Sequence, residues 1–147
     1  MSTEQFQTLG KWQETGPDSA IALIEDIHGR VVLQLRDDFE NVTLGGFWGM
    51  FGGQVEPGES LITAVAREIE EETSLQFDEN AYLPFVRMVS DHGHRHFVFK
   101  LQSRITPSQI RVGEGAGFAC FRQQQLSQIK LLPAARKVLN YHFGHPA

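Results

Sequence analysis

Three glutamates in the central segment 60–75 carry the most informative spacing in this chain: Glu68, Glu71 and Glu72. On a helix, at about 100° per residue, their carboxylates fall within roughly one quadrant beside an apolar face. Glu68 and Glu72 repel each other at this spacing, and the helix dipole disfavours anions near a C-terminus. A divalent cation offsets both effects, and hard oxygen ligands suit Mg²⁺ or Mn²⁺. The alternative is a solvated acidic face, the usual fate of a run of charges.

A glycine pair precedes this helix and favours the metal-binding interpretation. Gly52 and Gly53 allow the backbone to bend sharply and to approach a ligand closely. Glu59 and Arg67 are spaced so that they can pair across two helical turns and hold the loop against the helix. A tight glycine loop that enters a helix with three carboxylates predicts a metal–phosphate site.

The apolar pattern predicts the elements that position this site. Ser60 is a suitable N-cap for the central helix, and Pro133 suits the start of a second helix near the end of the chain. We predict strands at 19–27, 31–36, 47–55, 82–90, 97–101 and 118–121, a helical turn at 126–129, and helices at 60–75 and 134–143. A short turn joins the first two strands as a hairpin. Strands that precede and follow one strong helix favour an α/β class, with helices packed on the faces of a mixed β-sheet.

Length and composition narrow the classes of protein. The chain has 147 residues, a net charge of −5 and one cysteine, Cys120. We predict a single domain, 19–147, after a loosely attached lead-in, 1–18, for which an early strand is the alternative. One cysteine excludes an internal disulfide framework and a four-cysteine zinc site, and we expect Cys120 to be a buried apolar residue. There is no basic footprint for nucleic acid, no apolar run of about 20 residues and no signal-peptide pattern. We therefore expect a cytoplasmic protein without nucleic-acid or membrane partners.

The segment 53–75 resembles the Nudix box, G-x5-E-x7-R-E-U-x-E-E-x-G-U, where U is apolar. The positions that the pattern specifies are occupied by Gly53, Glu59, Arg67, Glu68, Ile69, Glu71, Glu72 and Leu75. Ser74 stands in place of the last glycine, which normally helps the helix to end. Just upstream, residues 48–53 are similar to the W-x-U-P-G-G sequence that leads into the box, with Phe51 in place of proline.

The resemblance implies a Nudix-type α/β/α sandwich with a mixed β-sheet, and hydrolysis of the pyrophosphate bond in a nucleoside diphosphate linked to another group. The substrate would be a nucleotide sugar, an ADP-ribose-like compound or a nucleoside triphosphate. The implied cofactor is Mg²⁺, or Mn²⁺, because divalent ions neutralise a diphosphate and activate water. Relatives often form dimers, so a homodimer is one possible assembly. The alternative function is a non-catalytic Nudix-fold domain that binds a nucleotide or a protein.

The resemblance also implies roles for individual residues. Glu68 and Glu72 are the expected metal ligands, and Glu71 is a further ligand or the base. Glu71 and Glu72 are therefore the candidate catalytic carboxylates of the box. The remaining positions supply a carbonyl to the metal (Gly52) or organise the motif (Gly53, Glu59 and Arg67).

Three residues outside the box are further candidates. Glu114, between glycines, is a second candidate for the catalytic base, with a solvated loop residue as the alternative. Arg36 can bind a substrate phosphate through a bidentate fork, or it can pair with Asp37 or Asp38. Trp48 is a candidate to stack on a base, although most aromatic side chains belong to the core.

Two segments bear on the metal and on the substrate. His92, His94 and His96 alternate, so a strand would place them on one face, as in a zinc site. Gly93 instead favours a polar turn or a substrate-facing edge. The long loop 37–47 leaves room for a group beyond the base, which favours nucleoside diphosphate-linked substrates over triphosphates.

Overall fold

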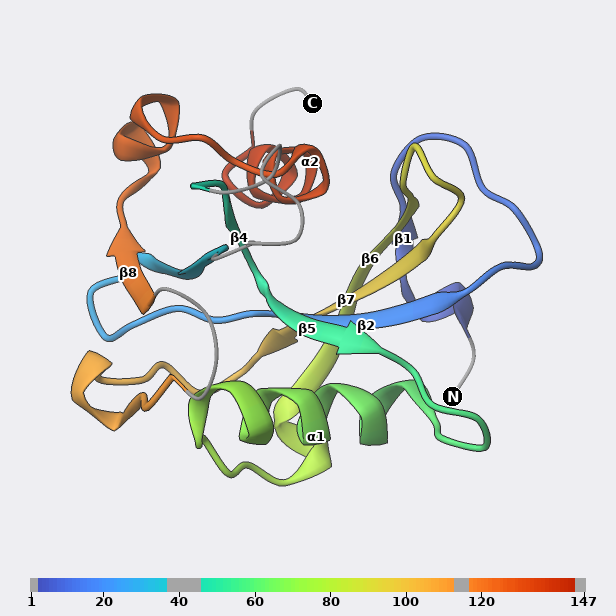
Figure 1. The fold of residues 1–147 in the computed structure, drawn as a ribbon, viewed down its shortest axis with the longest axis horizontal. Helices are drawn as coiled ribbons and strands as arrows, with labels where there is room; N and C mark the ends of the chain where they lie inside the picture. The colour runs from blue at the N-terminus through green and yellow to red at the C-terminus, as the bar shows by residue number, and fades with distance from the viewer. Residues whose placement is uncertain (1–2, 37–45, 113–116, 145–147) are drawn as a thin grey trace.

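The computed structural model describes residues 3–36, 46–112 and 117–144, which form an α/β fold (Figure 1). The strands are β1 (Gln7–Thr8), β2 (Asp18–Leu23), β3 (Val31–Leu35), β4 (Trp48–Gly49), β5 (Phe51–Gln54), β6 (Tyr82–Val89), β7 (Arg95–Leu101) and β8 (Gly117–Phe121). The α-helices are α1 (Leu61–Thr73) and α2 (Pro133–His142). Short 3₁₀ helices occupy Thr3–Gln5, Glu79–Ala81, Pro107–Gln109 and Gln123–Gln128.

The described strands form two sheets. The five-stranded sheet has the order β1-β6-β7-β2-β5. It is mixed, since β1 runs parallel to β6 and β2 parallel to β7, whereas β6 is antiparallel to β7 and β2 to β5. The three-stranded sheet has the order β4-β3-β8 and is antiparallel. In Figure 1, α1 lies on one side of the strands and α2 on the other. The predicted α/β/α sandwich with a mixed sheet is therefore confirmed.

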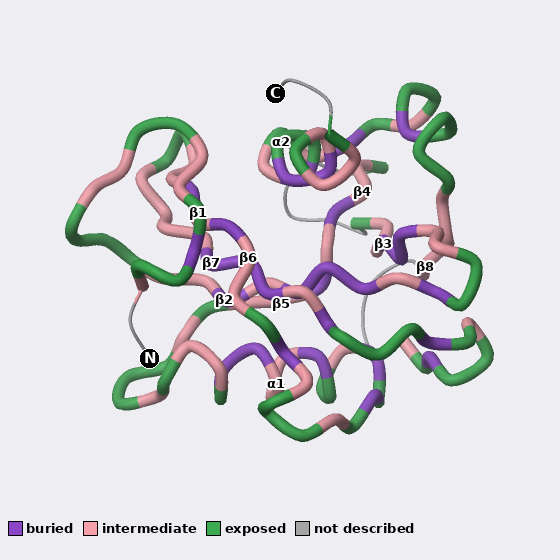
Figure 2. The backbone as a smooth tube through the Cα atoms, turned by 180° about the vertical axis from the view of Figure 1, so that it is seen from behind, coloured by how far each residue is buried: buried purple, intermediate pink, exposed green. Residues whose placement is uncertain are grey.

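The alternation of side chains along the central strands creates a core on each face of the larger sheet. In β7, Phe97 and Phe99 are fully buried and belong to the same cluster as Ile69 of α1. Val98, between them, belongs to the opposite cluster, together with Val138 of α2. Figure 2 shows buried segments along the strands that cross between the two helices. Each helix therefore packs on its own hydrophobic core, and the larger sheet lies between the two cores.

The predicted hairpin between the first two long strands forms next to its turn, where Glu25 pairs antiparallel with Val31 and the Val32 N–H donates to the Ile24 carbonyl at 2.9 Å. Asp26 is buried, accepts hydrogen bonds from the backbone N–H groups of His28 and Arg30 at 2.9 Å each, and so closes the turn. Beyond it the strands separate, because β2 pairs with β5 and β7 whereas β3 pairs with β4 and β8. The hairpin is therefore confirmed only for the residues beside the turn, and the turn connects two sheets.

The N-terminal residues that the structure describes pack against the larger sheet. β1 adds a short strand beside β6. Phe6 is 3% exposed, and its ring centroid lies 5.3 Å from that of Phe97 and 5.1 Å from that of Phe99. The Arg87 guanidinium lies 4.1 Å from the centre of the Trp12 ring. Residues 3–17 are thus joined to the core, in contrast to the loose attachment expected for the lead-in.

Both ends of α1 are defined by serines. The Ser60 hydroxyl accepts a hydrogen bond from Thr63 N–H at 3.2 Å, which confirms the predicted N-cap. Ser74 ends the helix in the left-handed conformation, with φ 64° and ψ 9°, and its N–H donates to the Glu70 carbonyl at 2.9 Å. Among the residues that the structure describes, Ser74 is the one non-glycine residue with a positive φ. The serine therefore adopts the conformation that glycine usually supplies at this position.

We expect Ser74→Gly to stabilise the protein by about 1 kcal/mol, because glycine adopts left-handed φ without a Cβ clash. Urea unfolding of the variant and the wild type measures the difference. Ser60→Ala is the matched control at the other end of α1 and should destabilise by about 1 kcal/mol through loss of the cap. A Ser74→Gly variant no more stable than the wild type would show that the left-handed serine carries no strain.

Candidate active site

The glycine pair of β5 brings the strand against its neighbours. Gly52 has φ +151°, and a Cβ there would meet the Ala20 carbonyl oxygen and lie 2.6 Å from the Ile21 Cα. Only glycine therefore allows β5 to approach β2 this closely. The Gly52 N–H donates to Glu72 Oε1 at 2.8 Å. This hydrogen bond ties the last turn of α1 to the glycine pair.

Gly53 makes room for a second carboxylate. A Cβ on Gly53 would lie 2.5 Å from each Glu68 carboxylate oxygen, so the Glu68 head group occupies the space that a side chain would fill. The Glu68 side chain is only 15% exposed. The carboxylates of Glu68 and Glu72, both on α1, thus lie beside two successive residues of β5. This agrees with the helical spacing, which places them on one side of the helix.

Arg67 organises the box through several contacts. Its Nε and Nη2 donate to the two oxygens of Glu59 at 2.7 and 2.9 Å. Its Nη2 also donates to the Gln54 carbonyl at 3.2 Å, and its Nη1 donates to Glu68 at 3.0 Å and to Glu71 at 3.3 Å. The Arg67 hydrogen bonds lower the pKa of Glu59 to about 2. The predicted pair of Glu59 and Arg67 is confirmed, and it fixes the loop between β5 and α1.

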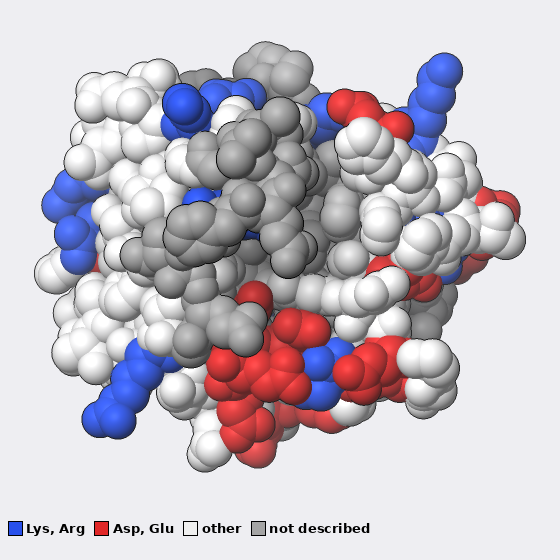
Figure 3. Space-filling model, viewed as in Figure 1, with Lys and Arg blue, Asp and Glu red and all other residues white. Residues whose placement is uncertain are grey.

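The box carboxylates lie in an environment that disfavours their negative charge. Burial raises the pKa of Glu68, although the Arg67 contact opposes this effect. Burial also raises the pKa of Glu72 to about 7, and the charges of Glu68 and Glu71 add to the shift. The Gly52 N–H and Arg36 act in the opposite direction. Figure 3 shows acidic atoms gathered over α1 around basic atoms. A nearby cation would lower the pKa of Glu68 and Glu72 and favour their charged forms.

The metal-binding prediction fits the chemistry of these residues but not their present rotamers. Within residues 3–36, 46–112 and 117–144, no group of three or more His, Cys, Asp or Glu side chains is placed to hold a metal ion. Arg67 Nη1 contacts both Glu68 and Glu71. Partly buried oxygen donors with raised pKa suit a hard divalent cation, and Glu71, 58% exposed, has space to move. The donor types therefore suit a divalent cation, although the described side chains are not arranged as a metal centre.

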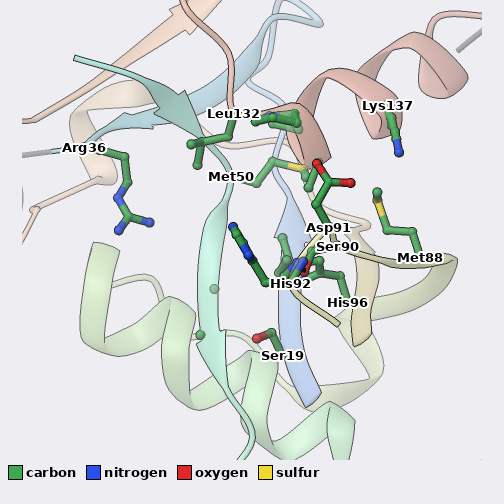
Figure 4. Close-up of a pocket in the computed structure, with 16 residues that line it drawn as sticks. Ser19, Arg36, Met50, Met88, Ser90, Asp91, His92, His96, Leu132 and Lys137 are labelled. Atoms are coloured by element: carbon green, nitrogen blue, oxygen red, sulfur yellow. Dashed lines mark hydrogen bonds between the residues drawn. The ribbon is translucent and has the colours of Figure 1, made fainter. Parts of the chain in front are cut away.

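A cavity of about 400 Å³ opens beside the glycine pair, between the larger sheet and the start of α2 (Figure 4). Arg36 lines it and lowers the pKa of Glu72, so its guanidinium acts on the box from the cavity side. This placement fits the predicted contact with a substrate phosphate. The described residues that line it are Ser19, Ile21, Arg36, Met50, Gly52, Gly53, Met88, Ser90, Asp91, His92, His96, Leu132, Pro133, Ala134, Ala135 and Lys137.

The structure does not place Trp48 with these residues. Its ring packs edge-to-face on Phe121, with the centroids 4.9 Å apart, and its backbone bonds to Lys130 and Leu132. Trp48 is half-buried and is not among the described residues that line this cavity, so its contacts agree with the packing role that the sequence left as the alternative, and stacking on a base stays a prediction. Glu114 and residues 37–45 lie outside the described residues. Cys120 is only half-buried, where we expected full burial.

The histidine segment includes the predicted polar turn, since the Ser90 N–H donates to the His94 carbonyl at 2.8 Å between β6 and β7. His92 and His96 line the cavity, as a substrate-facing edge would. The ring of His94 stacks on that of His96, with centroids 6.2 Å apart. These three histidines do not form a metal-binding group in the described structure. Lys137 and Met88 also line the cavity, and sequence reasoning missed both because they reach it from α2 and β6, far away along the chain.

Comparison with protein-family models matches residues 15–141 to the NUDIX domain. The chain belongs to the Nudix family. The match covers every box residue discussed above. Family and fold together support hydrolysis of a pyrophosphate bond. Among the described residues, no helix is both long and apolar enough to cross a bilayer.

Solved structures and one curated relative extend the comparison. The Nudix domain is similar to the MutT Nudix hydrolase from Burkholderia pseudomallei, with 26% identity, 86% of this chain and 98% of that chain covered, and a TM-score of 0.68. It shares its fold with the MutT protein from Methanosarcina mazei Go1, with 22% identity, 95% of each chain covered and a TM-score of 0.67. It is also 40% identical over 75 residues to an octanoyltransferase from Myxococcus xanthus, a match that spans 51% of this chain and 17% of that protein.

Proposed function

We propose that the protein hydrolyses the pyrophosphate bond of a nucleoside diphosphate linked to another group, with Mg²⁺ or Mn²⁺ as cofactor. The observation that carries the proposal is the placement of Glu68 and Glu72 at the glycine pair, beside a cavity that Arg36 lines. Glu68 and Glu72 would hold the metal, with the Gly52 carbonyl as a further ligand and Glu71 as either a ligand or the base. When bound, the metal neutralises the diphosphate and lowers the pKa of a water molecule.

The chain's own residues then bind and orient the substrate. Arg36 offers its planar guanidinium to a phosphate from the cavity side. The paired side chains of Glu59 and Arg67 keep the loop and α1 in register, so the carboxylates stay aligned with the glycine pair. Glu71, exposed on α1, or Glu114 would accept the proton of the attacking water.

A second hollow favours a substrate with a group on each side of the reacting bond. A volume of about 550 Å³ adjoins Glu68 and is lined by Gly16, Pro17, Asp18, Gln54, Val55, Glu56, Pro57 and Glu68. Residues adjacent in sequence divide between the two hollows, with Gly53 in the first and Gln54 in the second. Asp18 is bound by Arg95 and Glu68 by Arg67, so the Glu56 carboxylate is the group here that can accept hydrogen bonds from the hydroxyls of a second group. This supports nucleoside diphosphate-linked compounds over triphosphates.

A panel of nucleotide sugars, ADP-ribose and nucleoside triphosphates, incubated with Mg²⁺ or Mn²⁺, tests the proposal. We expect linked diphosphates to yield a nucleoside monophosphate and the phosphorylated second group, and triphosphates to react more slowly. Mass spectrometry of the products identifies the cleaved bond. Turnover confined to triphosphates would contradict the assignment of the second hollow.

A non-catalytic domain that binds a nucleotide is the second candidate. The contacts of Arg67 with Glu68 and Glu71 favour it, because they engage the carboxylates that a metal would need. Absence of turnover on the whole panel with either metal, together with nucleotide binding, would support this candidate.

A further inference from the structure

Side chains from three neighbouring strands form the sheet side of the cavity. His96 of β7 pairs in register with Ser19 of β2 on one side and with Met88 of β6 on the other. All three line the cavity (Figure 4). Side chains at paired positions lie on the same face of a sheet, about 5 Å apart. His96 and Ser19 thus present neighbouring polar groups to a ligand in the cavity.

The imidazole of His96 has an unmet hydrogen-bonding group. Its Nδ1 is buried and has no hydrogen-bond partner among the described residues. Burial lowers the pKa of His96, and the neighbouring His94 lowers it further. The ring is therefore neutral near pH 7 and offers one donor and one acceptor. A buried polar atom without a partner is uncommon in native proteins and calls for a ligand or a water.

The other walls suit the faces of a flat ring. The apolar residues that line the cavity around this polar side include Met50, Leu132 and Ile21. Methionine side chains adapt readily to the shape of a ligand. A nucleobase combines apolar faces with a hydrogen-bonding edge. Arg36 lines the same cavity near the box, so a phosphate there and a base beside His96 would belong to one nucleotide.

We infer that His96, with Ser19 beside it, hydrogen-bonds the edge of the substrate's nucleobase and helps to determine which nucleotide is accepted. This inference rests on the proposed function, since it takes the nucleotide part of the substrate to lie in the first cavity. His96 acts in recognition and has no part in breaking the pyrophosphate bond.

Calorimetric titration without metal tests the inference separately from catalysis. The probes are AMP, GMP, CMP and UMP, with ribose 5-phosphate as the ligand that lacks a base. We expect at least one monophosphate to bind the wild type more tightly than ribose 5-phosphate. His96→Leu should weaken that monophosphate about tenfold or more, whereas His96→Asn, which keeps a donor and an acceptor, should stay within about threefold. Ribose 5-phosphate should bind the wild type and both variants equally.

His94→Leu is the matched control, because His94 stacks on His96 but is not among the described residues that line the cavity. We expect it to bind the monophosphates like the wild type. Chemical shifts of the His96 ring nitrogens should change when the monophosphate is added and stay unchanged with ribose 5-phosphate. Equal binding by His96→Leu and the wild type, equal weakening of all ligands, or no binding of any monophosphate would overturn the inference. An enzyme that binds a monophosphate through His96 but hydrolyses nothing would contradict the proposed function alone.

Discussion

Glu72→Gln should reduce turnover of the best panel substrate by about 100-fold or more, because it removes a charged metal ligand worth several kcal/mol of transition-state stabilisation. The variant should keep its fold, since glutamine retains an oxygen that can accept the Gly52 N–H hydrogen bond. Mg²⁺ should raise the melting temperature of the wild type, because it binds the folded carboxylates, and should raise that of the variant much less. Steady-state kinetics and thermal unfolding measure the two effects.

In the metal-free protein, we expect Glu72→Gln to change the thermal stability by an amount that depends on pH. The folded pKa of Glu72 is about 7, against an ordinary value of 4.5. The fold thus favours the protonated form, so the stability that Glu72 contributes is fully present below about pH 4.5 and is lost as the pH rises through about 7. Glutamine does not ionise. In EDTA, Glu72→Gln should therefore melt at a higher temperature than the wild type at pH 8, and the difference should shrink towards pH 5.

Glu70→Gln is the matched control on the same helix. The Glu70 side chain is exposed and bonds to Gln76, away from the glycine pair. We expect its turnover and its response to Mg²⁺ to match those of the wild type. A Glu72→Gln variant with wild-type turnover would refute the metal-ligand assignment, whereas equal losses in both variants would point to a general effect of charge.

The parts of the site that were predictable from the sequence depend on short-range spacing. The pairing of Glu59 with Arg67 follows from helical geometry, and so does the cap at Ser60. The placement of Glu68 and Glu72 beside the glycine pair also follows, because it needs only one strand, one turn and one helix. These contacts lie within one short segment, in which the helical spacing of the apolar residues and the turn residues are both clear in the sequence.

The parts that were not predictable depend on strand pairing across the chain. Trp48 was a candidate to stack on a base, with core packing as the alternative, and its edge-to-face contact with Phe121 depends on the pairing of β8 with β3. His96 was recognised as a polar residue, yet its neighbour Ser19 is known only once β2 is seen beside β7. The divergence of β2 and β3 into two sheets has the same cause, since the partners that separate them, β5, β7, β4 and β8, come later in the chain. The local pattern of one strand does not determine which later strands pair with it.

Gly53→Ala should leave the protein folded and inactivate the site. The added Cβ would meet the carboxylate end of Glu68, which is flexible and can move aside, whereas its backbone need not shift. We expect unfolding in urea to change by no more than about 1 kcal/mol, while turnover falls by about 100-fold because Glu68 loses its place beside β5. Circular dichroism, urea unfolding and kinetics on the best panel substrate measure these quantities.

Gly52→Ala, one residue earlier, should give the opposite balance. Its Cβ would meet the backbone of β2 at Ala20 and Ile21, which cannot move without parting the strands, and its φ of +151° is rarely adopted by alanine. We expect a loss of about 3 kcal/mol or more in unfolding free energy, or failure to fold. The two variants differ by one position along β5. Together they distinguish the need for close packing of β5 on β2, at Gly52, from the need for space for the Glu68 carboxylate, at Gly53. If Gly53→Ala were fully active, the Glu68 carboxylate would not need its place over β5, and the metal site would have to be built from other residues.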